Sequence, residues 1–144
     1  MADYNVTLEL YQGIDFAGAF FFFNPDPSGF GNPNNLVPRN FTNYNARMMV
    51  RLANNAQSPL ILSLTSSPAA GLSFVSGTTS PGPAAPAYPN GVQINITKAQ
   101  TLAIANNYPG ETQFAYDLMA DNLGSGTTEL LMCGPLILQS TVTR

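Results

Sequence analysis

Residues 91–120 constrain the fold of this chain more than any other segment. Over residues 92–96 apolar side chains alternate with polar ones, which is the period of a strand with one buried face. Thr97 and Gln100 then have the S/T-x-x-E/Q spacing of a helix capping box. A second alternating segment covers residues 114–118. We therefore expect a strand, one short helical turn and another strand. The segment contains no catalytic motif, so it indicates a structural role.

The same strand period recurs in short segments along the rest of the chain. These segments cover residues 6–11, 16–23, 44–51, 60–64, 72–75 and 130–138. Proline and glycine interrupt them, and we expect irregular loops at 24–40 and 76–90. We also expect a bulge or an edge position at Gly134 and Pro135. The pattern predicts an all-β fold in which residues 1–144 form a single antiparallel β-sandwich of immunoglobulin-like (Ig-like) type. A jelly roll or a small barrel is the main alternative.

Composition limits the partners of the chain. Charged residues make up only 9% of its 144 residues, and five basic against eight acidic residues give a formal net charge of −3. The basic residues form no run, so we expect no nucleic-acid partner, because such binding needs a patch that neutralises phosphates. No apolar stretch approaches the ~20 residues of a membrane helix, and the N-terminal segment has no signal-peptide pattern. We therefore expect no membrane partner and synthesis in a cytoplasm.

The residues that commonly carry catalysis are scarce. The chain has no histidine and a single cysteine, Cys133, so common zinc ligand sets, histidine-based triads and an intramolecular disulfide are excluded. Cys133 lies in an apolar run, where we expect a small buried side chain. Two acidic pairs, Glu9 with Asp15 and Asp117 with Asp121, lack the flanking residues typical of acid–base catalysis. We expect no enzyme, no cofactor and no metal.

One cross-strand ion pair is expected from the strand pattern. Arg47 and Arg51 share the polar face of one predicted strand, and Asp117 lies on the polar face of another. We interpret these residues as an exposed ion pair and not as a ligand site, and such a pair contributes only ~0–1 kcal/mol.

Two predicted strands are apolar on both faces, although the outer face of a sandwich strand normally meets water. Four consecutive phenylalanines occupy residues 20–23, and residues 130–138 are nearly all apolar. One interpretation is that a loop, such as the proline-rich loop, covers the outer side chains. We favour the alternative that another subunit covers them, because exposed apolar patches usually mark interfaces. The predicted interface residues are Phe20, Phe21, Phe22, Phe23, Met48, Met49, Leu136, Ile137 and Leu138.

Three segments of the chain, taken in order, are FTNYNARMMVR at residues 41–51, VQINITKAQTLAI with TQFAYDLMA within residues 92–120, and GPLILQSTVTR at residues 134–144. Together they resemble a family of small tailed-bacteriophage virion proteins. Members of the family read approximately G-Y-T-A-R-M-Q-I-R, then I-T-[LV]-x-I-[ST]-x-x-[QA]-T-x-x-[LI], then Y-x-Y-D-L-E-[LV], and end in V-T-R. The match spans most of the chain, and its motifs are strand patterns and turn residues.

The resemblance implies an Ig-like β-sandwich and a structural role in the virion, in the tail or baseplate region. The implied partners are other virion proteins and copies of the same chain. Phenylalanines stand where family members commonly have a tryptophan or threonines on the outward side of the second strand, and Pro135 stands where they have a charged or polar residue, which suits a densely packed place in a particle. The matching positions, implied to serve folding and packing, are Tyr44, Ala46, Arg47, Met48, Arg51, Tyr116, Asp117, Leu118, Val142, Thr143 and Arg144.

Two alternatives to a tail component remain open. A capsid decoration or cement protein would need the same contact properties. A host-surface glycan-binding module is a different class, for which Tyr88, Tyr108 and the asparagine-rich loops would supply stacking rings and amide hydrogen bonds.

Overall fold

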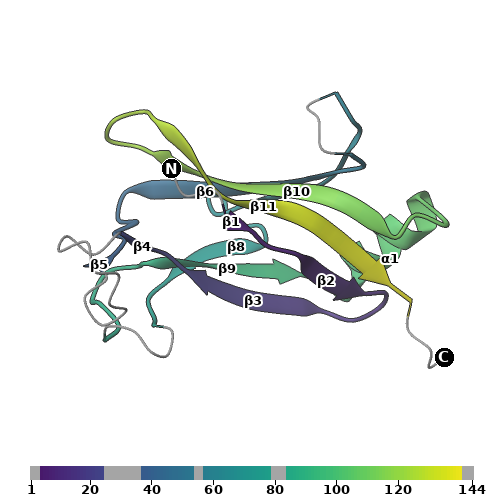
Figure 1. Ribbon diagram of the computed structural model, residues 1–144, viewed down its shortest axis with the longest axis horizontal. Coiled ribbons are helices and arrows are strands. Elements are labelled where there is room, and N and C mark those ends of the chain that lie inside the picture. The colour runs from purple at the N-terminus through teal and green to yellow at the C-terminus, as the bar shows by residue number, and fades with distance from the viewer. Residues whose placement is uncertain (1–3, 25–36, 54–56, 79–83, 141–144) are drawn as a thin grey trace.

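The computed structural model describes residues 4–24, 37–53, 57–78 and 84–140. Within these ranges the fold is all-β, with several sheets and a single helix (Figure 1). The elements are β1 (Tyr4–Asn5), β2 (Leu8–Tyr11), β3 (Phe16–Phe21), β4 (Phe23–Asn24), β5 (Val37–Pro38), β6 (Tyr44–Arg51), β7 (Leu60–Thr65), β8 (Leu72–Val75), β9 (Gly91–Ile96), α1 (Lys98–Asn107), β10 (Gln113–Asn122) and β11 (Thr128–Gln139). The predicted alternating segments thus form strands, and residues 1–3 and 141–144, with Val142, Thr143 and Arg144, lie outside the described residues.

The larger sheet has six strands and mixes two directions. Its order is β1-β11-β10-β6-β7, with β2 also paired to β11. The β11–β10, β10–β6 and β6–β7 pairs are antiparallel, but β1 and β2 run parallel to β11. The prediction of a purely antiparallel fold was therefore wrong for the N-terminal strands. Parallel neighbours need a long crossover, and here the whole intervening chain supplies it.

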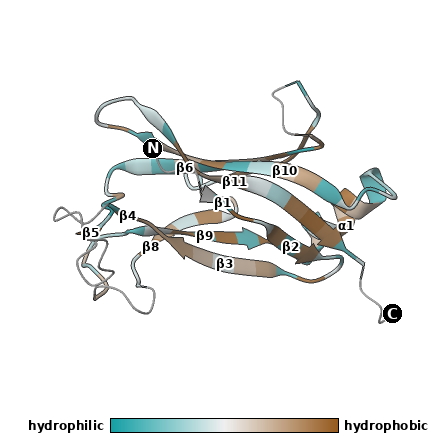
Figure 2. Ribbon diagram, in the orientation of Figure 1, coloured by the Kyte–Doolittle hydropathy of each residue, from teal (hydrophilic) through white to brown (hydrophobic). Residues whose placement is uncertain are grey.

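A second sheet contains three antiparallel strands in the order β3-β9-β8, and β4 and β5 form a separate two-residue ladder. Figure 1 shows the two larger sheets as layers, one above the other. The residues between them form one hydrophobic cluster, and Figure 2 shows apolar residues along β2, β3 and the C-terminal half of β11. The fully buried large side chains of this hydrophobic cluster are Phe41, Phe114, Leu10, Met48, Leu64, Ile94, Ile96, Leu118, Leu131, Met132, Leu136 and Leu138.

The bulge in β11 lies earlier than predicted. The register with β10 shifts between Leu118 and Met119, and the extra residue opposite this step is Leu131. Gly134 and Pro135 instead lie beside the gap between β1 and β2. No strand of the described residues pairs with β11 on that side at these two residues, so the N–H that proline lacks is not needed there. A side chain at position 134 would collide with the nearby main chain, so only glycine fits there.

Helix α1 confirms the capping box and exceeds the single turn that was predicted. The Thr97 hydroxyl accepts from the Gln100 N–H at 3.2 Å, and the Gln100 side chain accepts from the Thr97 N–H at 2.9 Å. The whole helix, Lys98–Asn107, is 10 residues long. It is fixed to the rest of the chain by buried Thr101, whose hydroxyl accepts from the Gly13 N–H at 3.0 Å and donates to the Lys98 carbonyl at 2.9 Å.

Candidate interaction surfaces

Four of the predicted interface residues lie inside the core. Phe22 is 5% exposed, and Met48, Leu136 and Leu138 are 0% exposed. Successive side chains of a strand point to opposite faces, and Met48, Leu136 and Leu138 lie on the inner faces of their strands. Phe22 lies between β3 and β4 and also points into the core. This corrects the expectation for these four side chains, which are not available to a partner while the chain is folded.

The four phenylalanines do not form one patch. Phe20 is half-buried and packs against the core cluster. Phe21 lies on the opposite side of β3, where a methyl group added to Gly77 or Gly91 would overlap its ring. Phe23 is half-buried in the β4–β5 ladder. The two glycines thus make room for an outward ring, which lies close over the main chain.

The outer face of the six-stranded sheet carries apolar side chains beside charged ones. Met119 pairs with Leu130 on one side and with Arg47 on the other. In the next row Asp117 lies between Cys133 and Met49. The half-buried apolar residues of this outer face are Met49, Ala115, Met119, Leu130, Cys133, Pro135 and Ile137. Met49 and Ile137 were predicted as interface residues, whereas Cys133 was expected to be buried and is half-buried here.

The charged groups of this outer face pair differently from the prediction. Arg47 donates from Nε to Asp121 at 3.1 Å, and the Thr128 hydroxyl donates to the other oxygen of the same carboxylate. These contacts, the hydroxyl first and then the guanidinium, hold the pKa of Asp121 below its usual value. Arg51 donates to the Ser58 carbonyl at 3.1 Å. The cross-strand ion pair therefore exists, but its acidic partner is Asp121.

Asp117 stands apart from these contacts. Within the described residues its carboxylate makes no hydrogen bond, and its direct cross-strand neighbours are Met49 and Cys133. Burial raises the pKa of Asp117, and the positive charges of Arg51 and Arg47 offset only part of that effect. An incompletely solvated carboxylate thus lies near the centre of the apolar outer face.

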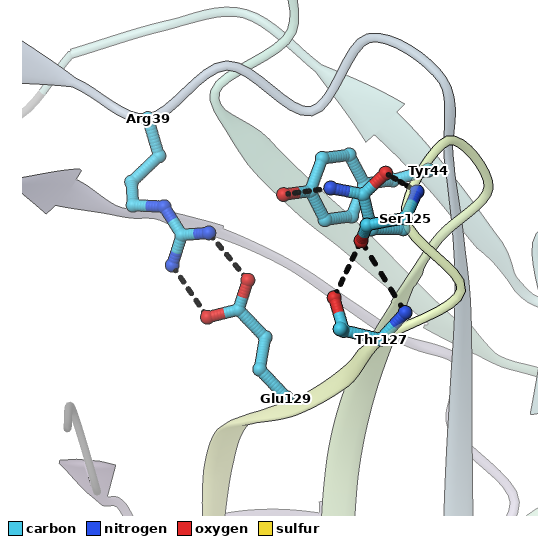
Figure 3. Close-up of polar contacts among 6 residues, drawn as sticks. Arg39, Tyr44, Ser125, Thr127 and Glu129 are labelled. Atoms are coloured by element: carbon cyan, nitrogen blue, oxygen red, sulfur yellow. Dashed lines mark hydrogen bonds and ion pairs between the residues drawn. The ribbon is translucent and has the colours of Figure 1, made fainter.

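A polar cluster ties the segment that follows β5 to the β10–β11 hairpin. Arg39 forms a two-pronged ion pair with Glu129, with one N–O distance of 2.9 Å, and this contact raises the pKa of Arg39 (Figure 3). The guanidinium also lies 5.1 Å from the ring centroid of Phe41. In the hairpin, the Ser125 and Thr127 hydroxyls are hydrogen-bonded at 2.7 Å. These contacts fix the geometry of the hairpin and of the segment around Arg39, because both oxygens of the Glu129 carboxylate are occupied.

A buried asparagine organises the base of the predicted loop at 76–90. Asn90 is 0% exposed, and its side-chain amide accepts from the Gly77 N–H and donates to the Gly77 carbonyl, both at 2.9 Å. The sequence does not single out Asn90, because asparagine followed by Gly91 is typical of an ordinary turn. Much of both predicted loops, residues 25–36 and 79–83, lies outside the described residues.

The tyrosines proposed for glycan stacking lie in different parts of the molecule. The Tyr88 hydroxyl donates to the Pro38 carbonyl at 3.2 Å, beside the β4–β5 ladder. Tyr108 caps the C-terminus of α1 and packs edge-on against Phe114, with ring centroids 6.3 Å apart. Figure 1 places β5 and α1 at opposite ends of the long axis, so these two rings do not form one stacking platform.

An open depression of about 470 Å³ borders the outer face. Asn5, Gln113 and Cys133 supply polar atoms to it, and Leu52 and Pro135 are among its apolar walls. Small-molecule sites usually enclose most of their ligand, which an open depression does not do.

The described residues hold neither a metal-binding cluster nor a membrane-spanning helix. These residues contain no group of three or more cysteine and acidic side chains placed to hold a metal ion. In the same part of the chain no helix has the length and apolar character needed to cross a membrane. Compared with known proteins, the chain matches no protein-family model and no curated protein.

Proposed function

We propose that this chain is a non-enzymatic structural subunit of a bacteriophage particle, located in the tail or baseplate. It acts through contacts with copies of itself and with other virion proteins. The observation that carries the proposal is the outer face of the six-stranded sheet, where the apolar side chains of Met49, Met119, Leu130 and Ile137 remain partly exposed. Apolar residues grouped on the outside of a folded domain are typical of an interaction surface.

We also propose that the two sheets form an Ig-like sandwich. The order β2-β11-β10-β6-β7 corresponds to strands A′, G, F, C and C′ of such a fold, and β3-β9-β8 corresponds to B, E and D. The parallel β2–β11 pair is then the contact between the first and the last strand. This assignment supports the virion proposal, because the resembling segments at residues 41–51 and 92–120 supply the C, E and F strands.

The virion proposal is tested by particle fractionation. Phage particles from cells that carry this gene are purified on a density gradient and separated into heads and tails, and both fractions are analysed by mass spectrometry. We expect the chain to follow the tail fraction in a fixed ratio to other tail proteins. Recovery with heads alone would assign it to capsid decoration, and absence from washed particles would rule out a virion role.

A further inference from the structure

Strand β3 leaves one edge of the three-stranded sheet without a partner. It pairs with β9 on one side, and no other strand in the described part of the chain pairs with it on the other. Exposed edges are normally protected by charged residues, proline, bulges or short length. Strand β3 has the sequence FAGAFF, is six residues long and has an unbroken register with β9, so it carries none of these protections.

The direction of the main-chain groups shows which of them are free. Asn95 of β9 donates its N–H to the Gly71 carbonyl at 2.8 Å, on the side of β8 and away from β3. Its partner Ala17 is therefore in a pair without mutual hydrogen bonds to β9. By the same alternation the N–H and C=O groups of Ala17 and Ala19 point to the open edge.

The inner side of the same edge is also incompletely covered. Phe16 and Phe20 face the core, yet both remain partly exposed, because no strand of the described residues lies beyond β3. Their rings converge over Gly18, where an added Cβ would lie 3.1 Å from the ring of Phe16 and 3.4 Å from that of Phe20. A further strand at this edge would bury both rings and satisfy the free main-chain groups.

The sequence of β3 indicates which strand that is. Residues 16–20 read F-A-G-A-F in both directions, with Gly18 at the centre. A two-fold axis at Gly18 places Phe16 opposite Phe20 and Ala17 opposite Ala19 in an antiparallel pair. The free groups of Ala17 then meet those of Ala19 in the partner, which gives about four main-chain hydrogen bonds.

Charge does not oppose a second copy of the chain at this edge. With a formal net charge of −3, two copies repel wherever acidic side chains meet. Strand β3 has no charged residue, and the carboxylate that precedes it, Asp15, accepts from the Lys98 N–H at 2.6 Å. This edge therefore allows close approach of two identical strands.

We propose that β3 pairs antiparallel with β3 of a second copy about a two-fold axis at Gly18, which joins two three-stranded sheets into one continuous sheet. Such an interface is isologous, with the same residues on both sides. The inference rests on the proposed function and names one of its self-contacts.

The test uses charges placed directly across the axis. Ala17→Lys with Ala19→Lys puts like charges opposite one another in both cross-strand pairs. Ala17→Lys with Ala19→Glu puts opposite charges there and adds no net charge. By sedimentation velocity we expect the wild type to reach twice its 15.3 kDa monomer mass as concentration rises. The double lysine variant should raise the dimer Kd about tenfold or more, and the lysine–glutamate variant should restore dimers.

A control places a single lysine one strand further in. Asn95→Lys changes the outer face of β9 beside Ala17, but its main-chain groups point away from the open edge. We expect this variant to dimerise nearly as well as the wild type. Circular dichroism and thermal unfolding of every variant show whether the fold is retained, and the lysine–glutamate pair keeps the test valid if the double lysine variant unfolds.

Amide hydrogen exchange reads the edge directly. In the dimer the amides of Ala17 and Ala19 should exchange slowly, and on dilution to monomer they should exchange rapidly. A wild type that stays monomeric at all concentrations would overturn the inference. So would a dimer that is indifferent to the sign of the charge at positions 17 and 19. Recovery of the chain in phage tails would leave the proposed function intact in either case, whereas β3 dimers without particle association would overturn only the proposed function.

Discussion

At the scale of single residues, two neighbouring aspartates on the outer face have opposite environments. Asp121 accepts from Thr128 and Arg47, whereas Asp117 accepts no hydrogen bond within the described residues. The pKa of Asp121 is accordingly lowered and that of Asp117 is raised. Burial alone does not decide the sign, because the hydrogen bonds of the charged form outweigh desolvation at one position and are missing at the other.

This difference predicts opposite effects of the same substitution. A raised pKa in the folded state means that the charge of Asp117 costs stability above its unfolded pKa of ~3.9. A lowered pKa means that the charge of Asp121 contributes stability there, and that this contribution is lost as the pH falls through the folded value. At pH 7 we expect Asp117→Asn to stabilise and Asp121→Asn to destabilise, each by about 1 kcal/mol or less because both side chains are partly exposed.

Urea denaturation of dilute protein at neutral pH and at about pH 2.5 checks this pair of predictions. Both differences should shrink at the lower pH, because the wild-type carboxylates take up protons as the pH falls. Equal signs at neutral pH would contradict the assignment of hydrogen bonds on the outer face.

A second prediction at this scale concerns the buried amide of Asn90. Asn90→Ala leaves the N–H and the carbonyl of Gly77 without these partners, and we expect a loss of about 1–3 kcal/mol in the free energy of unfolding. Asn106→Ala, at an exposed position of α1, is the matched control and should change stability little. Equal effects of the two substitutions would show that the amide does not organise the loop.

At the scale of elements, the alternating pattern predicted which segments are strands but not how they pair. Alternation has the same period in parallel and antiparallel strands, so the direction of β1 and β2 relative to β11 left no trace in the sequence. The bulge at Leu131 was hidden for a related reason, because two adjacent apolar residues look like a strand that is apolar on both faces.

The same ambiguity explains the outcome for the predicted interface. A run such as Phe20 to Phe23 shows that both faces of a strand are apolar, but not which face lies toward the core. Met48 and Met49 show the point in one pair, since one is fully buried and the other lies on the outer face. Only the sheet order, which depends on contacts distant in sequence, separates the two faces.

Helix α1 gives a prediction for an element as a whole. Thr101→Val keeps the shape of the side chain but removes the acceptor for the Gly13 N–H, which should cost about 1–3 kcal/mol of unfolding free energy. Thr101→Ser keeps the hydroxyl and should retain most of that stability. Thermal and urea unfolding measure both variants, and a larger loss for Thr101→Ser than for Thr101→Val would mean that the methyl group, not the hydrogen bond, fixes the helix.

At the scale of the whole molecule, the described residues present two surfaces suited to different contacts. The open edge of β3 offers main-chain hydrogen bonds to an identical strand, whereas the outer face of the six-stranded sheet offers apolar side chains around Asp117. The two surfaces belong to different sheets and can be occupied at the same time. A subunit with two separate contacts of this kind can join more than one neighbour, as a component of a particle must.

The most direct measurement of the central claim is a cryo-electron microscopy reconstruction of the phage particle at a resolution that traces strands. We predict that this chain lies in the tail or baseplate, with the outer face formed by β6, β10 and β11 covered by a neighbouring subunit. A reconstruction in which every tail and baseplate density is assigned to other chains, or in which this chain is present with that face open to solvent, would contradict the account.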